Sequence, residues 1–117
     1  MSERQGSFRS KSKGERFERE IAAKYRAAGF NDAHRTAQYC GKTGQAADVE
    51  GVPGIHIECK HQERLQIYDW IDQAKRDAAG TGDIPAVHFR RNNCEVLVCI
   101  RFDDFVRLIT DGGATNE

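Results

Sequence analysis

Apolar residues recur along this chain at two different spacings. Spacings of three and four residues predict helices over residues 12–28 and 67–78, with Gly29 and Gly80 just beyond their ends, and a third helix capped by Asp103. Shorter apolar runs predict strands over residues 33–39, immediately before Asp48, and over residues 55–60, 84–89 and 95–100. This order of elements predicts the α/β fold class, a single domain with a central mixed β-sheet flanked by helices.

The first predicted helix carries an acidic residue at the edge of its apolar stripe. We place its start at Ser12, because Ser12 and Glu15 have the S-x-x-E form of a capping box. At about 100° per residue, Glu15 points away from the apolar stripe, whereas Glu18 lies on its edge. Of the two acids compared, Glu18 is therefore the one whose side chain can point towards a site beside the core.

The stretch ADVEGVPGIHIECKH, residues 47–61, places charged residues around a short apolar run. Because side chains in a strand alternate between its two faces, Glu58 and Lys60 share one face. The Pro-Gly pair at residues 53–54 predicts a turn, and the resulting hairpin would return Asp48 towards Glu58. Two carboxylates and a lysine would then converge, and oxygen ligands of this kind suit a hard cation such as Mg²⁺.

A simpler interpretation of this stretch is a solvent-facing sheet edge. A glutamate and a lysine two residues apart are by themselves a weak signal, since the two side chains can form an ordinary surface salt bridge. Asp48, ten residues upstream of Glu58 across the Pro-Gly turn, favours the metal site over the edge. A metal site requires that the fold bring Asp48 and Glu58 together, whereas a solvent-facing sheet edge does not.

The Gly-rich loop over residues 40–46 contains the letters GKT, which invite a comparison with the P-loop of nucleotide-binding proteins. That motif needs a glycine five residues before Gly41, where Thr36 stands, and it needs a strand before the loop and a helix after it. The sequence predicts neither element there, so we exclude a P-loop. A basic loop beside a carboxylate site can still contact a phosphate backbone through Lys42.

Composition narrows the class of protein. The 117 residues carry 18 basic and 18 acidic side chains, which argues mildly against a simple nucleic-acid coat protein. No apolar run is long enough to predict a membrane span, and no secretory signal is predicted. The four cysteines form no C-x-x-C pair, which predicts reduced thiols and no zinc site. We expect a cytoplasmic protein, in the host cytoplasm if a phage encodes it.

The two ends of the chain differ in charge. Residues 1–12 are basic and contain serine and glycine, which predicts a flexible N-terminal arm that contacts phosphates. Acidic residues predominate near the other end, where we expect residues 111–117 to form a disordered tail. Residues 13–110 would then form the folded domain.

Four blocks of this sequence resemble the archaeal-type Holliday-junction resolvases and their phage relatives, within the PD-(D/E)XK nuclease superfamily. The blocks are KGERFEREIAAKYRAAGF at residues 13–30, HRTAQ at residues 34–38, Asp48 followed by IECK at residues 57–60, and IPAVHFRRNNCEVLV at residues 84–98. The resemblance implies a restriction-endonuclease-like fold for the folded domain. The chain differs from the family in two respects: its net charge is neutral, and the composition of the segment between Arg35 and Asp48 is different.

The resemblance also implies roles for particular residues. Carried over position by position, the catalytic set is Glu18, Asp48, Glu58 and Lys60. The implied metal ligands are Asp48, Glu58, the carbonyl of Cys59, and Glu18 either directly or through water. The residues implied or expected to contact DNA are Lys13, Arg19, Arg35, Lys42 and Gln73.

The function implied by the resemblance is a metal-dependent endonuclease of DNA recombination and repair. It would use Mg²⁺, with Mn²⁺ as a substitute and no small-molecule cofactor, and would act as a homodimer that resolves four-way junctions by paired symmetric nicks. Two alternatives remain open from the sequence: a nuclease of the same fold that acts on flaps, nicks or duplex DNA, and a DNA-binding module without catalysis. An apolar C-terminal set is the candidate dimer surface: Phe89, Val96, Val98, Phe102, Phe105 and Ile109.

Overall fold

The order of helices and strands is the one that the sequence predicts. The computed structural model describes residues 2–36 and 46–115, and the side chains within residues 12–36 and 46–111. Its elements are α1 (Ser2–Ala27), β1 (His34–Arg35), β2 (Val49–Glu50), β3 (Ile55–His61), α2 (Ile67–Ala78), β4 (Ile84–Arg90), β5 (Leu97–Cys99) and α3 (Phe102–Thr115).

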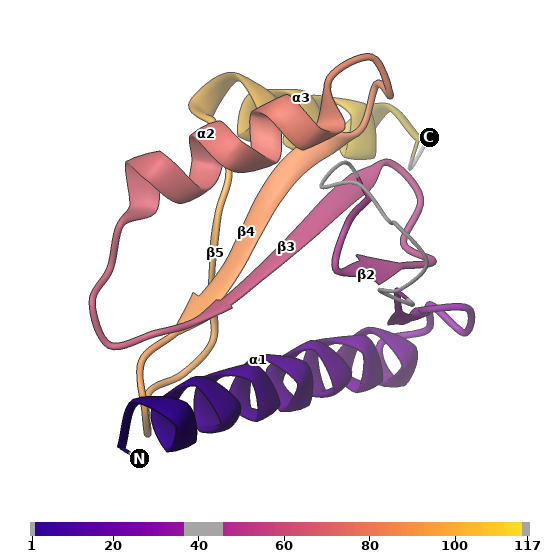
Figure 1. The fold of residues 1–117 in the computed structure, drawn as a ribbon. Coiled ribbons are helices and arrows are strands. Elements are labelled where there is room, and N and C mark those ends of the chain that lie inside the picture. The colour runs from indigo at the N-terminus through magenta and orange to yellow at the C-terminus, as the bar shows by residue number, and fades with distance from the viewer. Residues whose placement is uncertain (1, 37–45, 116–117) are drawn as a thin grey trace.

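The strands form one mixed sheet in the order β1-β2-β3-β4-β5. β3 and β4 are parallel, and the other neighbours are antiparallel. The parallel pair requires a crossover connection, which α2 provides. Figure 1 shows α1 along one side of the sheet and α2 along the opposite side. β3 is therefore the central strand of the sheet, with β2 on one side and β4 on the other.

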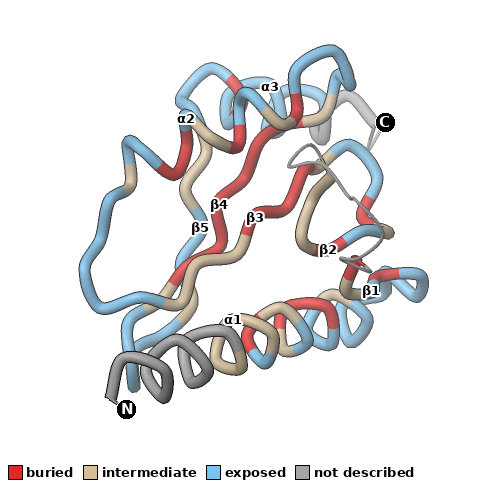
Figure 2. The backbone as a smooth tube through the Cα atoms, in the orientation of Figure 1, coloured by how far each residue is buried: buried red, intermediate tan, exposed pale blue. Residues whose placement is uncertain are grey.

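Two apolar clusters hold the layers together. On one face, Phe17 and Ile21 of α1 pack with Val49 and Ile57 of the sheet. On the other face, apolar residues of α2 and β4 form the second cluster: Trp70, Ile71, Ala74, Val87 and Phe89. Figure 2 shows the buried segments concentrated in β3, β4 and the inward sides of the two helices. This arrangement leaves the two faces of β3 with different surroundings.

The first helix begins earlier than the capping box predicts. α1 starts at Ser2, so Ser12 lies inside the helix instead of at its start. The preceding residues contain glutamate, arginine, glutamine and lysine and no proline, and these residues extend a helix readily. The helix ends where expected, before Gly29, whose φ of 111° suits glycine.

The remaining boundaries also differ in detail. α3 begins at Phe102, so Asp103 lies in its first turn and does not cap it. β1 and β5 are shorter than expected, and residues 37–39 of the first expected strand lie outside the described part of the chain. α1 and α3 run through residues 12–13 and 110–111, so neither expected domain boundary coincides with the end of an element. The division into arm, domain and tail stays a prediction.

Two further expectations concern thiols and membranes. Among the described residues, Cys59, Cys94 and Cys99 are free thiols. None of the described helices combines the length and apolar character that crossing a membrane requires.

Candidate active site

A tight hairpin places Asp48 against the middle of β3. The backbone N–H of Asp48 donates to the carbonyl of Ile57 at 2.8 Å, and the N–H of Cys59 donates to Asp48 Oδ2, also at 2.8 Å. The turn depends on Gly51, which has a φ of 99° and no room for a side chain, because an added Cβ would lie 2.2 Å from the carbonyl oxygen of Asp32. The hairpin thus brings Asp48 beside residues 58 and 59, as the sequence predicts.

Glu58 is buried, which excludes the simpler interpretation of a solvent-facing sheet edge. Only 4% of the residue is exposed, although it lies on the polar face of its strand. Its Oε2 lies 2.7 Å from Nε2 of His56, two residues earlier on the same face. Burial raises the pKa of Glu58, the His56 hydrogen bond opposes this shift, and the nearby Asp48 charge adds to it. Glu58 is therefore a carboxyl group in an enclosed site that already holds a second carboxylate.

Glu18 reaches the same region from α1. Its pKa is raised by burial and then by the Asp48 charge, which means that the two carboxylates lie within electrostatic reach of one another. Arg35 of β1 donates from Nε to Glu18 Oε1 at 2.7 Å, and its Nη2 lies 3.4 Å from Glu15 Oε2. Glu18 of α1 and Glu58 of β3 therefore both lie near Asp48, which immediately precedes β2, and the Arg35 guanidinium contacts both Glu15 and Glu18.

Lys60 completes the polar face of β3. Its Nζ donates to Oε1 of Gln73 at 3.3 Å, across the space between the sheet and α2. Gln73, a residue implied to contact DNA, is thus in contact with the lysine of the candidate site. This bond restrains the long lysine side chain, so its charge stays near the carboxylates.

The thiol of Cys59 belongs to the opposite face. It packs partly buried against the α1 cluster, and burial, followed by the charges of Asp48 and Glu18, raises its pKa. The thiolate is therefore disfavoured, and Cys59 offers the site its backbone. The role of its carbonyl as a metal ligand stays a prediction.

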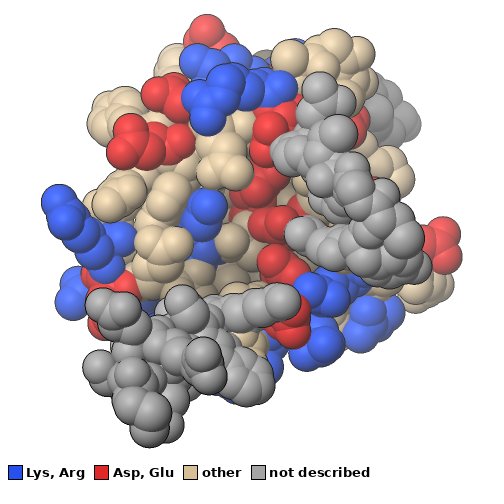
Figure 3. All heavy atoms as spheres, viewed as in Figure 1, with Lys and Arg blue, Asp and Glu red and all other residues tan. Residues whose placement is uncertain are grey.

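The basic residues expected to contact DNA are distributed around the acids. Arg35 is engaged by Glu18 and Glu15, Arg19 is exposed on α1, and Lys13 is half-buried. Lys42 falls in residues 37–45, outside the described residues. Figure 3 shows Asp and Glu gathered in a band across the middle of one face, with Lys and Arg on several sides of the band. A polyanion on this face would meet the basic side chains around the acids.

The sequence interpretation missed two residues of this region. His56, Glu58 and Asp77 of α2 have side-chain ligand atoms that all lie within 4.8 Å of one another. The sequence positions of both residues could have indicated that they lie near the site. His56 shares a strand face with Glu58, and Asp77 lies one helical turn after Gln73 and so on the same side of α2. Neither residue belongs to the D…(D/E)-x-K pattern, which is why the pattern did not find them.

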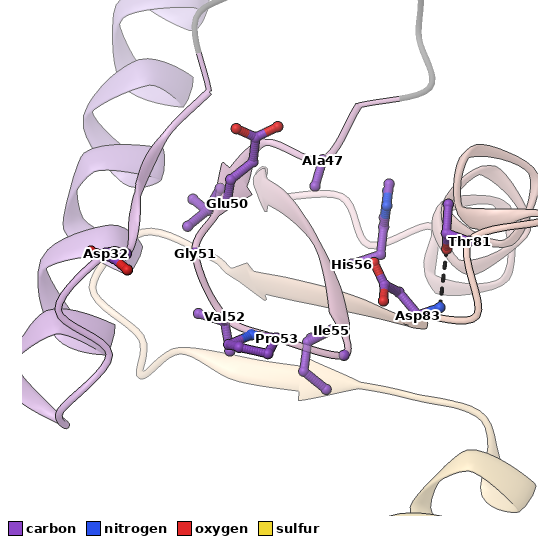
Figure 4. A pocket seen from close by; sticks show the side chains of 12 residues that line it. Asp32, Ala47, Glu50, Gly51, Val52, Pro53, Ile55, His56, Thr81 and Asp83 are labelled. Atoms are coloured by element: carbon purple, nitrogen blue, oxygen red, sulfur yellow. Dashed lines mark hydrogen bonds between the residues drawn. The ribbon is translucent and has the colours of Figure 1, made fainter.

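A pocket of about 490 Å³ opens beside the carboxylates, at the beginning of β3. His56, Thr81 and Asp83 lie on one side of it, and Asp32, Glu50 and Gly51 lie on the other (Figure 4). Asp48, Glu58 and Lys60 are not among its lining residues. His56 therefore both lines the pocket and contacts Glu58.

Comparison with known proteins gives a family match and structural matches. The family described as "Phage putative PDDEXK endonuclease" matches residues 9–114. Among solved structures, the chain is similar to Hjc, a Holliday junction resolvase from the archaeal hyperthermophile Archaeoglobus fulgidus, with a TM-score of 0.55 and 23% sequence identity over 73% of this chain and 74% of that one. A search of curated proteins found no match. The expected family resemblance and restriction-endonuclease-like fold are confirmed.

Proposed function

Because the chain belongs to the phage PDDEXK endonuclease family, we propose that it is a metal-dependent, structure-selective DNA endonuclease that resolves four-way junctions by paired symmetric nicks. The observation that carries this proposal is the arrangement of Glu18 and Glu58 around Asp48, with Lys60 on the same face of β3 as Glu58. The Hjc-like fold supports the choice of branched DNA over other nucleic acids.

The acidic cluster fits a divalent cation. Asp48 and Glu58 offer carboxylate oxygens, which hard cations such as Mg²⁺ prefer. Burial and the nearby Asp48 charge raise the pKa of both Glu18 and Glu58, so these carboxylates gain from a cation that offsets their charges. Asp48 and Glu58 would hold the ion with the carbonyl of Cys59, and Glu18 would bind it directly or through water. When bound, Mg²⁺ would supply Lewis acidity towards the phosphate and promote ionisation of a water molecule.

In this proposal, Lys60 stabilises charge during the reaction, and the surrounding basic residues bind the DNA backbone. The Lys60 ammonium would stabilise the negative charge that develops on the attacked phosphate, and Gln73 would hold the ammonium in place. Arg19, Arg35 and Lys13 would contact backbone phosphates, which position DNA without reading its sequence. Such contacts suit an enzyme that recognises a branched shape in varied sequences.

Metal removal tests this proposal. Cleavage of a synthetic four-way junction is expected with Mg²⁺ and with Mn²⁺, while Ca²⁺ is expected to support junction binding without cleavage. The reason is that the proposed ligands are oxygens, which bind all three ions. Gel analysis of labelled junction strands with each ion measures the outcome, and a reaction containing excess EDTA serves as the control. Undiminished cleavage in EDTA would refute the metal site.

We also propose that the protein acts as a homodimer, since two symmetric nicks need two active sites facing one junction. The expected surface needs correction: Phe89 is buried at 5% exposure, and Val96 packs against the α1 cluster, so both complete the monomer core. The other four expected residues are exposed, and with the exposed Leu97, which was not among the residues expected from the sequence, they form what we call the C-terminal apolar face of β5 and α3: Leu97, Val98, Phe102, Phe105 and Ile109. A two-fold contact is self-complementary, so this face can pair with its own copy.

Substitution within the C-terminal apolar face is expected to dissociate the dimer. Phe102→Ser removes the most exposed large apolar side chain of this face, at 76% exposure, and so should leave the monomer core intact. Sedimentation equilibrium at micromolar protein is expected to give twice the chain mass for the wild type and the chain mass for the variant. Tyr68→Ser, at an 85% exposed position on α2, is the matched control and should stay dimeric. A monomeric wild type that still makes paired nicks would refute the dimer.

A further inference from the structure

His56 lies between two carboxylates in the interior of the protein. Its side chain is only 5% exposed, and its Nε2 lies 2.7 Å from Oε2 of Glu58. Asp77 approaches the same pair from α2. When Glu58 is ionised its carboxylate can only accept hydrogen bonds, so Nε2 of His56 then carries the proton and donates to Glu58. The imidazole is thus a hydrogen-bond donor fixed beside a residue proposed to bind metal.

The hydrogen bond restricts rotation of the Glu58 carboxylate about its terminal torsion. The terminal torsion of a glutamate has a broad, shallow preference, so packing alone does not fix the plane of the carboxylate. A donor held on Oε2 restricts that plane. Asp77 adds to the need for this restraint, because its charge also raises the pKa of Glu58, whereas the His56 hydrogen bond lowers it.

We propose that His56 is a positioning residue: it donates a hydrogen bond to Oε2 of Glu58 and so holds that carboxylate in the orientation that binds the metal ion. Asp77 belongs to the same arrangement, as the α2 carboxylate beside the imidazole. This inference rests on the proposed function, because it assigns His56 to the metal site of the nuclease. It extends that site beyond the D…(D/E)-x-K pattern, to the strand residue two before Glu58 and to α2.

The pocket beside His56 provides an unusual test of this role. His56 is one of the residues that line the pocket, which has a volume of about 490 Å³ and opens to solvent, so truncating its side chain to alanine would open a space next to that pocket (Figure 4). Free imidazole can enter by that route and donate to Glu58 in place of the missing side chain. A purely structural defect would not be reversed in this way.

The experiment compares His56→Ala with His56→Gln, whose side-chain amide can donate an N–H at a similar reach. Mn²⁺ binding to the DNA-free protein is measured by calorimetry, and Mg²⁺-dependent junction cleavage is measured with and without imidazole. His56→Ala is expected to lower Mn²⁺ affinity by about 10- to 100-fold at unchanged stoichiometry, the usual effect of losing a partner that orients a metal ligand. His56→Gln is expected to retain most of the affinity, and imidazole is expected to restore cleavage by His56→Ala.

Two control variants make the result specific. His34→Ala removes a histidine that also faces a glutamate, Glu50 at 3.4 Å, but on an exposed part of β1, and it should change neither Mn²⁺ affinity nor cleavage. Glu58→Gln removes the proposed ligand itself, and imidazole should not restore its cleavage. Circular dichroism melting curves establish that each variant is folded, and if His56→Ala is unfolded, His56→Leu, which fills more of the space, takes its place as the variant without an N–H donor.

Three outcomes would overturn the inference. Unchanged Mn²⁺ affinity and cleavage in His56→Ala would show that the hydrogen bond has no role in the site. Loss of one bound Mn²⁺ per chain would make His56 a metal ligand and not a positioning residue. Loss of affinity in His56→Gln equal to that in His56→Ala would show that the N–H donor is not what matters. Failure of the proposed function looks different, because the wild type itself would then bind no Mn²⁺ and cut no DNA.

Discussion

Asp48→Asn and Glu58→Gln are each expected to lower the rate of junction cleavage by at least about a thousandfold, equivalent to about 4 kcal/mol of transition-state stabilisation. Each substitution removes a charged metal ligand and changes little volume. The fold should tolerate both, because an asparagine oxygen can still accept the bond from the Cys59 N–H and a neutral glutamine is less costly to bury than an ionised glutamate. Junction binding should persist, since removing negative charge near phosphates does not weaken it.

Single-turnover cleavage and gel mobility shifts measure these two effects separately. Glu50→Gln is the matched control, because it makes the same acid-to-amide change on the same hairpin at an exposed residue that pairs with His34. The control should cut at the wild-type rate. A folded Asp48→Asn or Glu58→Gln variant that also cuts at that rate would show that the active site lies elsewhere.

Lys60→Met is expected to slow cleavage by about 10²- to 10³-fold at saturating metal, the usual cost of losing one group that stabilises charge in a transition state. Methionine keeps most of the apolar stem and removes the ammonium. Mn²⁺ affinity should not fall, because Lys60 is not a ligand and its positive charge opposes cation binding. This combination of a lost rate and a retained affinity separates Lys60 from Asp48 and Glu58.

Lys75→Met provides the comparison for Lys60, since Lys75 lies exposed on α2, two residues after Gln73. Its removal should alter the cleavage rate little. Rates for Lys60→Met within about threefold of the wild type would exclude an electrostatic role of the size assigned to such groups.

Much of the fold could be predicted because its signals are local. The alternation around Glu58, the Pro-Gly turn and the helical spacing of Phe17 and Ile21 each depend on a few neighbouring residues. The hairpin that returns Asp48 to β3 follows from these signals. Glu18 could also be selected from α1, because its position at the edge of the apolar stripe is a property of the helix alone.

The remaining features depend on contacts between distant segments. Glu58 is buried because β3 lies inside the sheet and α2 lies over the face that Glu58 shares, and a strand's own pattern does not reveal these neighbours. Arg35, which is proposed to contact DNA, also pairs with Glu18 and Glu15, and it meets them only because α1 packs beside β1. Asp77 meets His56 only through the crossover of α2.

The measurement that tests the central claim most directly compares one set of DNA substrates under identical Mg²⁺ conditions. The set is a synthetic four-way junction and the flap, nicked and linear duplexes built from the same arm sequences, with every strand labelled in turn. The proposed function predicts rapid cleavage of the junction at symmetric positions in two opposing strands, with little cleavage of the linear duplex. Equal cleavage of all substrates would contradict junction selectivity and indicate a general nuclease, and binding of the junction without any cleavage would contradict the nuclease itself.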